Sequence, residues 1–141
     1  MYKKTEELDF ELKKANNLDN FLMDNDVEFD DKNFYKLLGE LVDESGKSKF
    51  NIAVESCISE PFIYNLLKGE KRPTRDTVIK LCFGLKLSLE YTERLLKLAG
   101  YSELYVRHKR DSILKFSLEN GLSLMEADEL LAQYGYSIVS D

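Results

Sequence analysis

The stretch GKSKFNIAVESCISEPFIYNLLKGEKRP, residues 46–73, decides the fold of this chain. It contains two short segments with helical spacing of apolar residues, and each follows a serine that can cap a helix, Ser48 or Ser59. Pro61 falls in the first turn of the second segment, where its missing N–H costs little. Arg72-Pro73 then forces an extended stretch. The pattern predicts two short helices joined by a tight turn.

Helical patterns continue on both sides of this stretch. Upstream, apolar residues recur at three- and four-residue spacing over residues 33–45. Downstream, caps and glycines indicate one helix over about residues 74–85 and another over about 88–100. With 2 Pro, 7 Gly and 43% hydrophobic residues among 141, the composition favours helices around a buried core. We therefore predict an all-α fold.

The C-terminal half contains an internal repeat. Residues 75–102 align without gaps to residues 110–137, and 11 of the 28 aligned positions are identical. Each copy is predicted to be a helical hairpin, and the copies should stack because a hairpin cannot bury its own apolar face. The chain after Tyr136 is expected to be loose. We expect the copies to pack through three apolar residues each: Val78, Leu81 and Leu95 in the first, and Ile113, Phe116 and Leu130 in the second.

The chain divides into three parts on these grounds. Residues 1–31 are an acidic segment with short helices, residues 32–102 the central helical domain, and residues 103–141 the additional hairpin and its loose tail. The acidic run at 24–31 lacks the glycine and the ligand alternation of a calcium loop, so it is predicted to be a solvated linker.

The formal net charge of −6 conceals a strong segregation of charge along the chain. Residues 1–46 carry a net charge of −7, residues 47–118 carry +6, and residues 119–141 carry −5. Solvated helix faces account for many such runs, but a basic block over the predicted helix pair also suits a polyanionic partner.

Several features of residues 46–73 resemble, in order and spacing, the phage-repressor-like (Xre) helix-turn-helix family. They are the small Ala53 where two helices cross, the apolar Ile58 in the turn, the cap Ser59, and the Gly-x-x-x-Pro pattern from Gly69 to Pro73. The resemblance implies a repressor-like helix-turn-helix bundle from about residue 32 to 100, extended here by the repeated hairpin. It also implies binding of double-stranded DNA, with the second helix of the pair in the major groove.

The resemblance assigns roles to individual residues. At 100° per residue, the second helix places Ile63, Leu66 and Leu67 on an apolar arc, opposite a face that would enter the groove. Asn65 is the strongest base-reading residue, since Asn can pair bidentately with adenine. The base-reading candidates are Glu60, Pro61, Tyr64 and Asn65, and the candidates for phosphate contact are Lys49, Lys68, Lys71, Arg72 and Arg75.

Three features depart from the family's pattern. The segment Glu60-Pro61-Phe62 stands where the family usually carries polar readers, Cys57 replaces the glycine typical of the turn, and Leu67 replaces a glutamate. Cys57 requires a turn that either avoids positive φ or holds it with strain. These departures bear on the reading of DNA sequence more than on the fold.

No other motif points to catalysis, a cofactor or a metal. His108 is expected to be a surface residue in a basic cluster, and Cys57 and Cys82 are expected to be small buried residues of a reduced, cytoplasmic protein. The chain has no glycine-rich phosphate loop, no paired metal-ligand motif, and no apolar run long enough to cross a membrane.

The sequence therefore predicts a non-enzymatic transcriptional regulator that acts by occupying a DNA site, as a homodimer in the manner of the family it resembles. An alternative stays open: a protein-interaction adaptor that keeps the fold but no longer reads DNA sequence. The acidic ends, Glu60 and the repeat favour the adaptor, whereas the basic central block favours DNA. The C-terminal helical repeats can also offer an outer groove to a protein partner.

Overall fold

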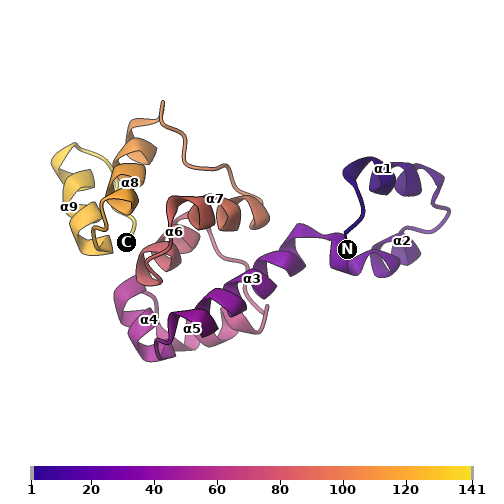
Figure 1. Cartoon of the computed structure of the whole chain (residues 1–141), viewed down its shortest axis with the longest axis horizontal. Helices are drawn as coiled ribbons and strands as arrows, with labels where there is room; N and C mark the ends of the chain where they lie inside the picture. The colour runs from indigo at the N-terminus through magenta and orange to yellow at the C-terminus, as the bar shows by residue number, and fades with distance from the viewer. Residues whose placement is uncertain (1, 141) are drawn as a thin grey trace.

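The computed structural model describes residues 2–140, which form nine α-helices, one 3₁₀ turn and no strand. The all-α prediction is confirmed for this part of the chain (Figure 1). In chain order the elements are α1 (Thr5–Lys14), α2 (Leu18–Asp24), the 3₁₀ turn η1 (Asp26–Glu28), α3 (Asp30–Ser45), α4 (Lys49–Ser56), α5 (Glu60–Leu67), α6 (Arg75–Gly84), α7 (Leu89–Leu98), α8 (Lys109–Glu119) and α9 (Leu124–Gln133).

The first two helices form a small hairpin that stands apart from the other helices, at the N-terminal end of α3 (Figure 1). Neither α1 nor α2 contains a buried residue. Polar contacts hold the hairpin together instead: Lys3 Nζ donates to Glu11 Oε1 at 2.8 Å and to Asn25 Oδ1 at 2.6 Å. The hairpin is therefore an arm that contributes little to the core.

Helices α3 to α7 enclose the main core. The face of α3 that carries Phe34, Leu38 and Leu41 is buried, and α3 packs along α7. Helix α4 packs most extensively against α6. At their closest approach, a Cβ atom added at Gly84 would lie 1.8 Å from Ser56 Oγ, so only glycine fits this position of α6.

The two copies of the repeat fold as two helical hairpins, α6–α7 and α8–α9, with matching turns. Lys86 and Gly121 occupy equivalent positions between the helices, and both have positive φ, at 54° and 67°. Gly100 and Gly135 follow the second helices and have φ of 88° and 81°. The repeat in sequence is therefore also a repeat of backbone conformation.

Two reciprocal Arg–Asp pairs join the hairpins. Arg75 donates through Nη1 and Nη2 to the two carboxylate oxygens of Asp111, at 3.1 and 3.0 Å. Arg110 donates in the same way to Asp76, at 3.0 and 3.1 Å. Each arginine also donates from Nε to the carbonyl oxygen of the last serine of its own copy. In each pair, the arginine of one copy binds the aspartate of the other copy. Because these contacts are reciprocal, the hairpins are related by an approximate two-fold axis.

The packing of the second hairpin differs from the prediction. Val78, Leu81 and Leu95 are buried as expected, but Phe116 is 55% exposed and both Ile113 and Leu130 are only half-buried. The reason is the two-fold arrangement, which pairs like faces of the two hairpins, while α3 and α4 already cover the other face of the first hairpin. The buried residues of α8 and α9 are instead Asp111, Leu114, Ser117, Leu124, Ala127, Asp128 and Leu131.

The two segments predicted to be a linker and a loose tail also differ from their predictions. The expected linker at 24–31 contains η1 and the start of α3. The expected loose tail is tied to α9 as far as Ser140, because Val139 is fully buried and its N–H donates to Asp128 Oδ1 at 2.7 Å. A single aspartate within an amphipathic helix carries no sequence signal of such a contact.

Candidate nucleic-acid interface

Helices α4 and α5 are two short helices joined by three residues. Both begin at serine caps: Ser48 Oγ accepts from the Asn51 N–H at 3.1 Å, and Ser59 Oγ accepts from the Phe62 N–H at 3.3 Å. Cys57 ends α4 in the left-handed region, with φ 54° and ψ 42°. The turn therefore holds a positive φ on a non-glycine residue, which costs about 1 kcal/mol relative to glycine.

The two cysteines differ in environment, which corrects the expectation that both are buried. Cys57 is exposed because it lies in the turn beyond the last residue of α4, whereas Cys82 is fully buried within α6. Burial raises the pKa of the Cys82 thiol to about 12. Cys82 is therefore a neutral core residue at any physiological pH.

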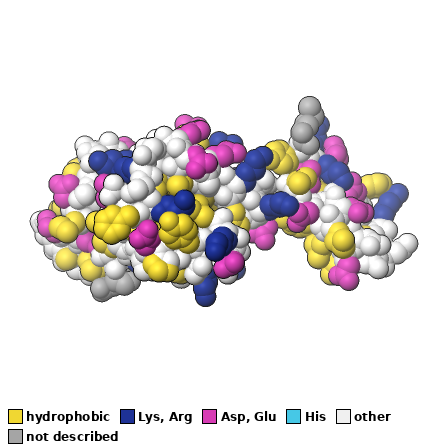
Figure 2. Space-filling view, turned by 90° about the horizontal axis from the view of Figure 1, so that it is seen from below, with side chains coloured by type: hydrophobic (Ala, Val, Ile, Leu, Met, Phe, Trp, Pro, Cys, Tyr) yellow, Lys and Arg dark blue, Asp and Glu magenta, His cyan; other side chains and the backbone are white. Residues whose placement is uncertain are grey.

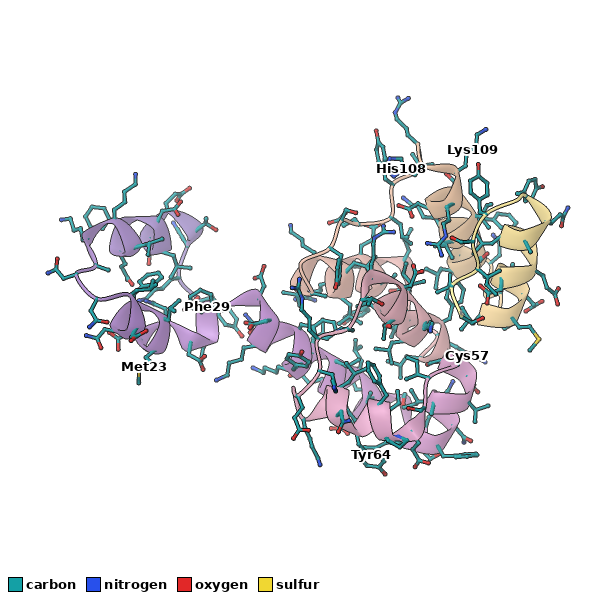
Figure 3. All side chains as sticks on the ribbon, turned by 180° about the vertical axis from the view of Figure 1, so that it is seen from behind. Met23, Phe29, Cys57, Tyr64, His108 and Lys109 are labelled. Atoms are coloured by element: carbon teal, nitrogen blue, oxygen red, sulfur yellow. The ribbon has the colours of Figure 1, made fainter. Side chains whose placement is uncertain are left out.

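The two faces of α5 separate as predicted. Ile63 and Leu66 are buried against the core, while Pro61, Tyr64 and Lys68 are exposed. Figure 3 shows Tyr64 pointing away from the body of the protein. The other two base-reading candidates, Glu60 and Asn65, are half-buried on α5.

Lys49 joins this exposed face from the start of α4. Its Nζ lies 5.2 Å from the centre of the Tyr64 ring, a cation–π distance. The side chain of Lys49 is therefore held next to α5 rather than free in solvent. Lys49 is therefore the phosphate candidate whose side chain lies against a base-reading candidate, Tyr64.

Three further phosphate candidates, Lys68, Lys71 and Arg72, lie at the end of α5 and in the loop after it, and all three are exposed. Two tyrosines fix the backbone of this loop. Tyr35 Oη donates to the Lys71 carbonyl at 2.7 Å, and Tyr101 Oη donates to the Pro73 carbonyl at 2.6 Å. The loop therefore presents its cations from a backbone that two side-chain hydrogen bonds hold in place, which lowers the entropy cost of ordering this backbone on a ligand.

The surroundings of the Tyr35 hydroxyl and of the Arg72 guanidinium are consistent with these contacts to the loop. Burial, and after it the Asp31 carboxylate, raises the pKa of Tyr35, so the hydroxyl keeps its proton and can donate. The Arg72 guanidinium lies 5.6 Å from the centre of the Tyr101 ring. Arg72 therefore lies against the Tyr101 ring, and Lys68 and Lys71 are exposed.

Arg75 does not join the other phosphate candidates. Its guanidinium donates to both oxygens of Asp111 and to the carbonyl oxygens of Ser102 and Glu103, so its hydrogen bonds are used within the fold. Arg75 is also only half-exposed. We therefore assign it to the junction of the two hairpins. The recurrence of Arg-Asp at 75–76 and 110–111 was the sequence signal of this role.

The surface around α4 and α5 mixes hydrophobic and charged side chains. Phe50 and Val54, four residues apart on α4, are exposed beside this face, and neither was among the residues predicted to form the interface. Glu55 forms an ion pair with Lys47. Figure 2, which views the molecule from the side of α4 and α5, shows exposed hydrophobic side chains between charges of both signs rather than a continuous basic surface.

A second group of cations lies elsewhere. His108 is exposed at the start of α8, with its ring edge-on to Tyr105 at 4.9 Å between centres. Figure 3 shows His108 and Lys109 on the side of the body opposite Tyr64.

Within residues 2–140, no three His, Cys, Asp or Glu side chains are grouped so that they could bind a metal ion. None of the helices in this part of the chain has the length and apolar character that a membrane span requires.

Comparison with known proteins adds no relative. No protein-family model, no curated protein and no solved structure matches this chain. The function must therefore be inferred from the geometry of α4, α5 and the loop that follows.

Proposed function

We propose that this protein is a DNA-binding transcriptional regulator of the repressor-like helix-turn-helix type, acting by occupancy of its site. The observation that carries the proposal is the exposed face of α5, with Lys49 at one side and Lys68, Lys71 and Arg72 at its end. A helix in the major groove needs polar side chains towards the base edges and cations towards the flanking phosphates. The three-residue turn between α4 and α5 supports the same interpretation.

Each base-reading candidate offers a different chemistry. Asn65 can donate to and accept from an adenine edge, and Glu60 can accept from a cytosine amine. Pro61 presents an apolar surface that can contact a thymine methyl group. Tyr64 can donate to a phosphate while Lys49 stays against its ring. Homodimerisation would double this set and give a two-fold symmetric site.

Salt dependence tests the proposal. Binding of the full chain to genomic DNA fragments would be measured at several salt concentrations. Replacing Lys68, Lys71 and Arg72 by Ala should flatten the slope of log affinity against log salt by about 3, because each phosphate contact contributes about 0.9. The matched control replaces three exposed cations of the arm, Lys4, Lys13 and Lys14, and should leave the slope unchanged.

Asn65→Ala should act differently from the triple variant. It should weaken binding to the preferred fragment by about 1–3 kcal/mol and leave non-specific binding nearly unchanged, because it removes a base contact and no charge. A wild-type protein with no preferred fragment and no salt slope would overturn the DNA proposal.

The exposed Phe50 and Val54 favour a second candidate, a protein-interaction adaptor on the same helices. Apolar side chains beside mixed charges are typical of protein interfaces more than of DNA interfaces. On this alternative, Phe50→Ala with Val54→Ala should weaken binding of a partner protein, while the lysine substitutions at 68 and 71 should have little effect on it.

A further inference from the structure

The second hairpin has an apolar face that no other part of residues 2–140 covers. This outer face consists of Ile113, Phe116, Leu130 and Tyr134, and its two aromatic residues are 55% and 63% exposed. With Ser112, these side chains line a shallow groove of about 300 Å³. Isolated exposed apolar residues are common, but a contiguous group on two adjacent helices indicates an interaction surface.

The equivalent face of the first hairpin is buried against other helices. The residues equivalent to Ile113, Phe116 and Leu130 are all at most 2% exposed, because α3 and α4 cover that face of α6–α7. They are Val78, Leu81 and Leu95, at an offset of 35. The same surface of the same hairpin therefore packs against helices in one copy and is open in the other.

The ends of the outer face carry opposite charges. Lys109 stands at the first turn of α8 and Glu119 at its last turn, and both are exposed. The position equivalent to Glu119 is Gly84, at the tight crossing of α4 and α6. A helix cannot approach α8 there as α4 approaches α6, so the open copy requires a different occupant from the covered one.

We propose that the outer face binds the outer face of a second copy of this chain, with the two α8 helices antiparallel. In the register that sets Ile113 opposite Phe116 of the other copy, Lys109 falls within one residue of Glu119, an axial offset of about 1.5 Å. The two-fold axis forms each of these contacts twice. Phe116 of each copy enters the groove beside Ile113 and Tyr134 of the other.

A second copy fits this face better than the exposed apolar residues of the arm. On α2, the exposed apolar residues are accompanied by acidic residues alone, which would satisfy Lys109 but leave Glu119 opposite like charges. On α1, whose last turn is basic, the two exposed hydrophobic residues lie on opposite sides of the helix and form no apolar face. A second outer face offers an apolar surface together with both charges in antiparallel order, so it satisfies both ends. The inference names the surface of the homodimer in the proposed function and rests on that part of it, not on DNA binding.

Self-association of the full chain tests the surface directly. Sedimentation velocity over a range of concentrations should show a monomer–dimer equilibrium, and Phe116→Glu should weaken it at least about 30-fold, as expected for a central aromatic contact. The fold should survive, since Phe116 is mostly exposed. The control Met125→Glu, 71% exposed and about 140° around α9 from Leu130, should dimerise like the wild type.

Charge exchange tests the register. Lys109→Glu and Glu119→Lys should each weaken self-association about tenfold or more, because each places like charges together. An equimolar mixture of these two variants should form heterodimers of near wild-type affinity, since every contact again joins opposite charges. The double variant should also recover.

Two results would overturn this inference: a monomeric wild type at high concentration, or a dimer that is insensitive to Phe116→Glu. A mixture that fails to recover would likewise reject the antiparallel register. DNA affinity is read separately from the salt slope, so a failure here is distinguishable from a failure of DNA binding.

Discussion

Arg75 and Asp111 form a bidentate ion pair, with Nη–Oδ distances of 3.1 and 3.0 Å, across the junction of the two hairpins. The equivalent residues Arg110 and Asp76 form the same pair in the opposite direction. Copies stacked by translation would not exchange partners in this way. The repeat is therefore closed about a two-fold axis and does not extend as a solenoid.

This junction predicts unequal effects of the two arginines on stability. Arg75→Ala should lower the free energy of unfolding by about 3 kcal/mol, because it leaves the carboxylate of Asp111, only 6% exposed, without its charged partner. Arg110→Ala should cost less, about 1 kcal/mol, because Asp76 is 40% exposed. Urea denaturation measures both. Equal losses in the two variants would contradict the asymmetry.

The same aspartate predicts a loss of stability in acid. Burial works to raise the pKa of Asp111, but the hydrogen bonds from Arg75 and from the Tyr105 N–H outweigh it and hold the pKa below its usual range. Since the native state favours the ionised form, this stabilisation is present above the unfolded pKa of about 4 and is lost as the pH falls through the native value.

Urea denaturation at a series of pH values from about 6 downwards measures this effect. In Asp111→Asn, the fall in stability towards acid should be shallower than in the wild type, although the variant is less stable at neutral pH. Parallel curves for the two proteins would assign the acid sensitivity to other carboxylates.

The crossing of α4 and α6 predicts opposite effects of two Gly→Ala substitutions. Gly84→Ala should lower stability by about 2 kcal/mol or more, because its Cβ would lie 1.8 Å from Ser56 Oγ and 3.2 Å from the Ser56 backbone nitrogen. Gly39→Ala is the matched control: no atom lies within 4 Å of its added Cβ, so it should stabilise α3 by about 0.5–1 kcal/mol. Thermal unfolding compares them, and effects of the same sign would contradict the close approach.

The two thiols should differ in reactivity. At pH 8 a soluble thiol reagent should modify Cys57 rapidly and leave Cys82 unmodified until the protein unfolds, because Cys82 is fully buried and its thiol pKa is about 12. Cys57→Ser should abolish the fast phase. Two fast thiols in the native wild type would show that α6 is open to solvent.

Local chemistry in the sequence was sufficient to predict most of the helices near the candidate interface. The serines at 48 and 59 accept the expected N-terminal hydrogen bonds, and the apolar arc of α5 faces the core. These features depend on residues three or four positions apart, so they can be read without knowing the rest of the fold. The same holds for the exposure of Pro61, Tyr64 and Lys68.

What only the tertiary structure decided was which surfaces meet. Helix α8 is apolar on two sides, at Leu114 and at Ile113 with Phe116, and its periodicity does not distinguish the side that packs from the side that stays open. Arg75 has the side-chain chemistry of a phosphate contact, but its guanidinium forms an ion pair with Asp111, 36 positions away in the sequence. Periodicity records that a face is apolar, whereas its partner depends on the relative placement of distant segments, which is set by packing of the whole chain.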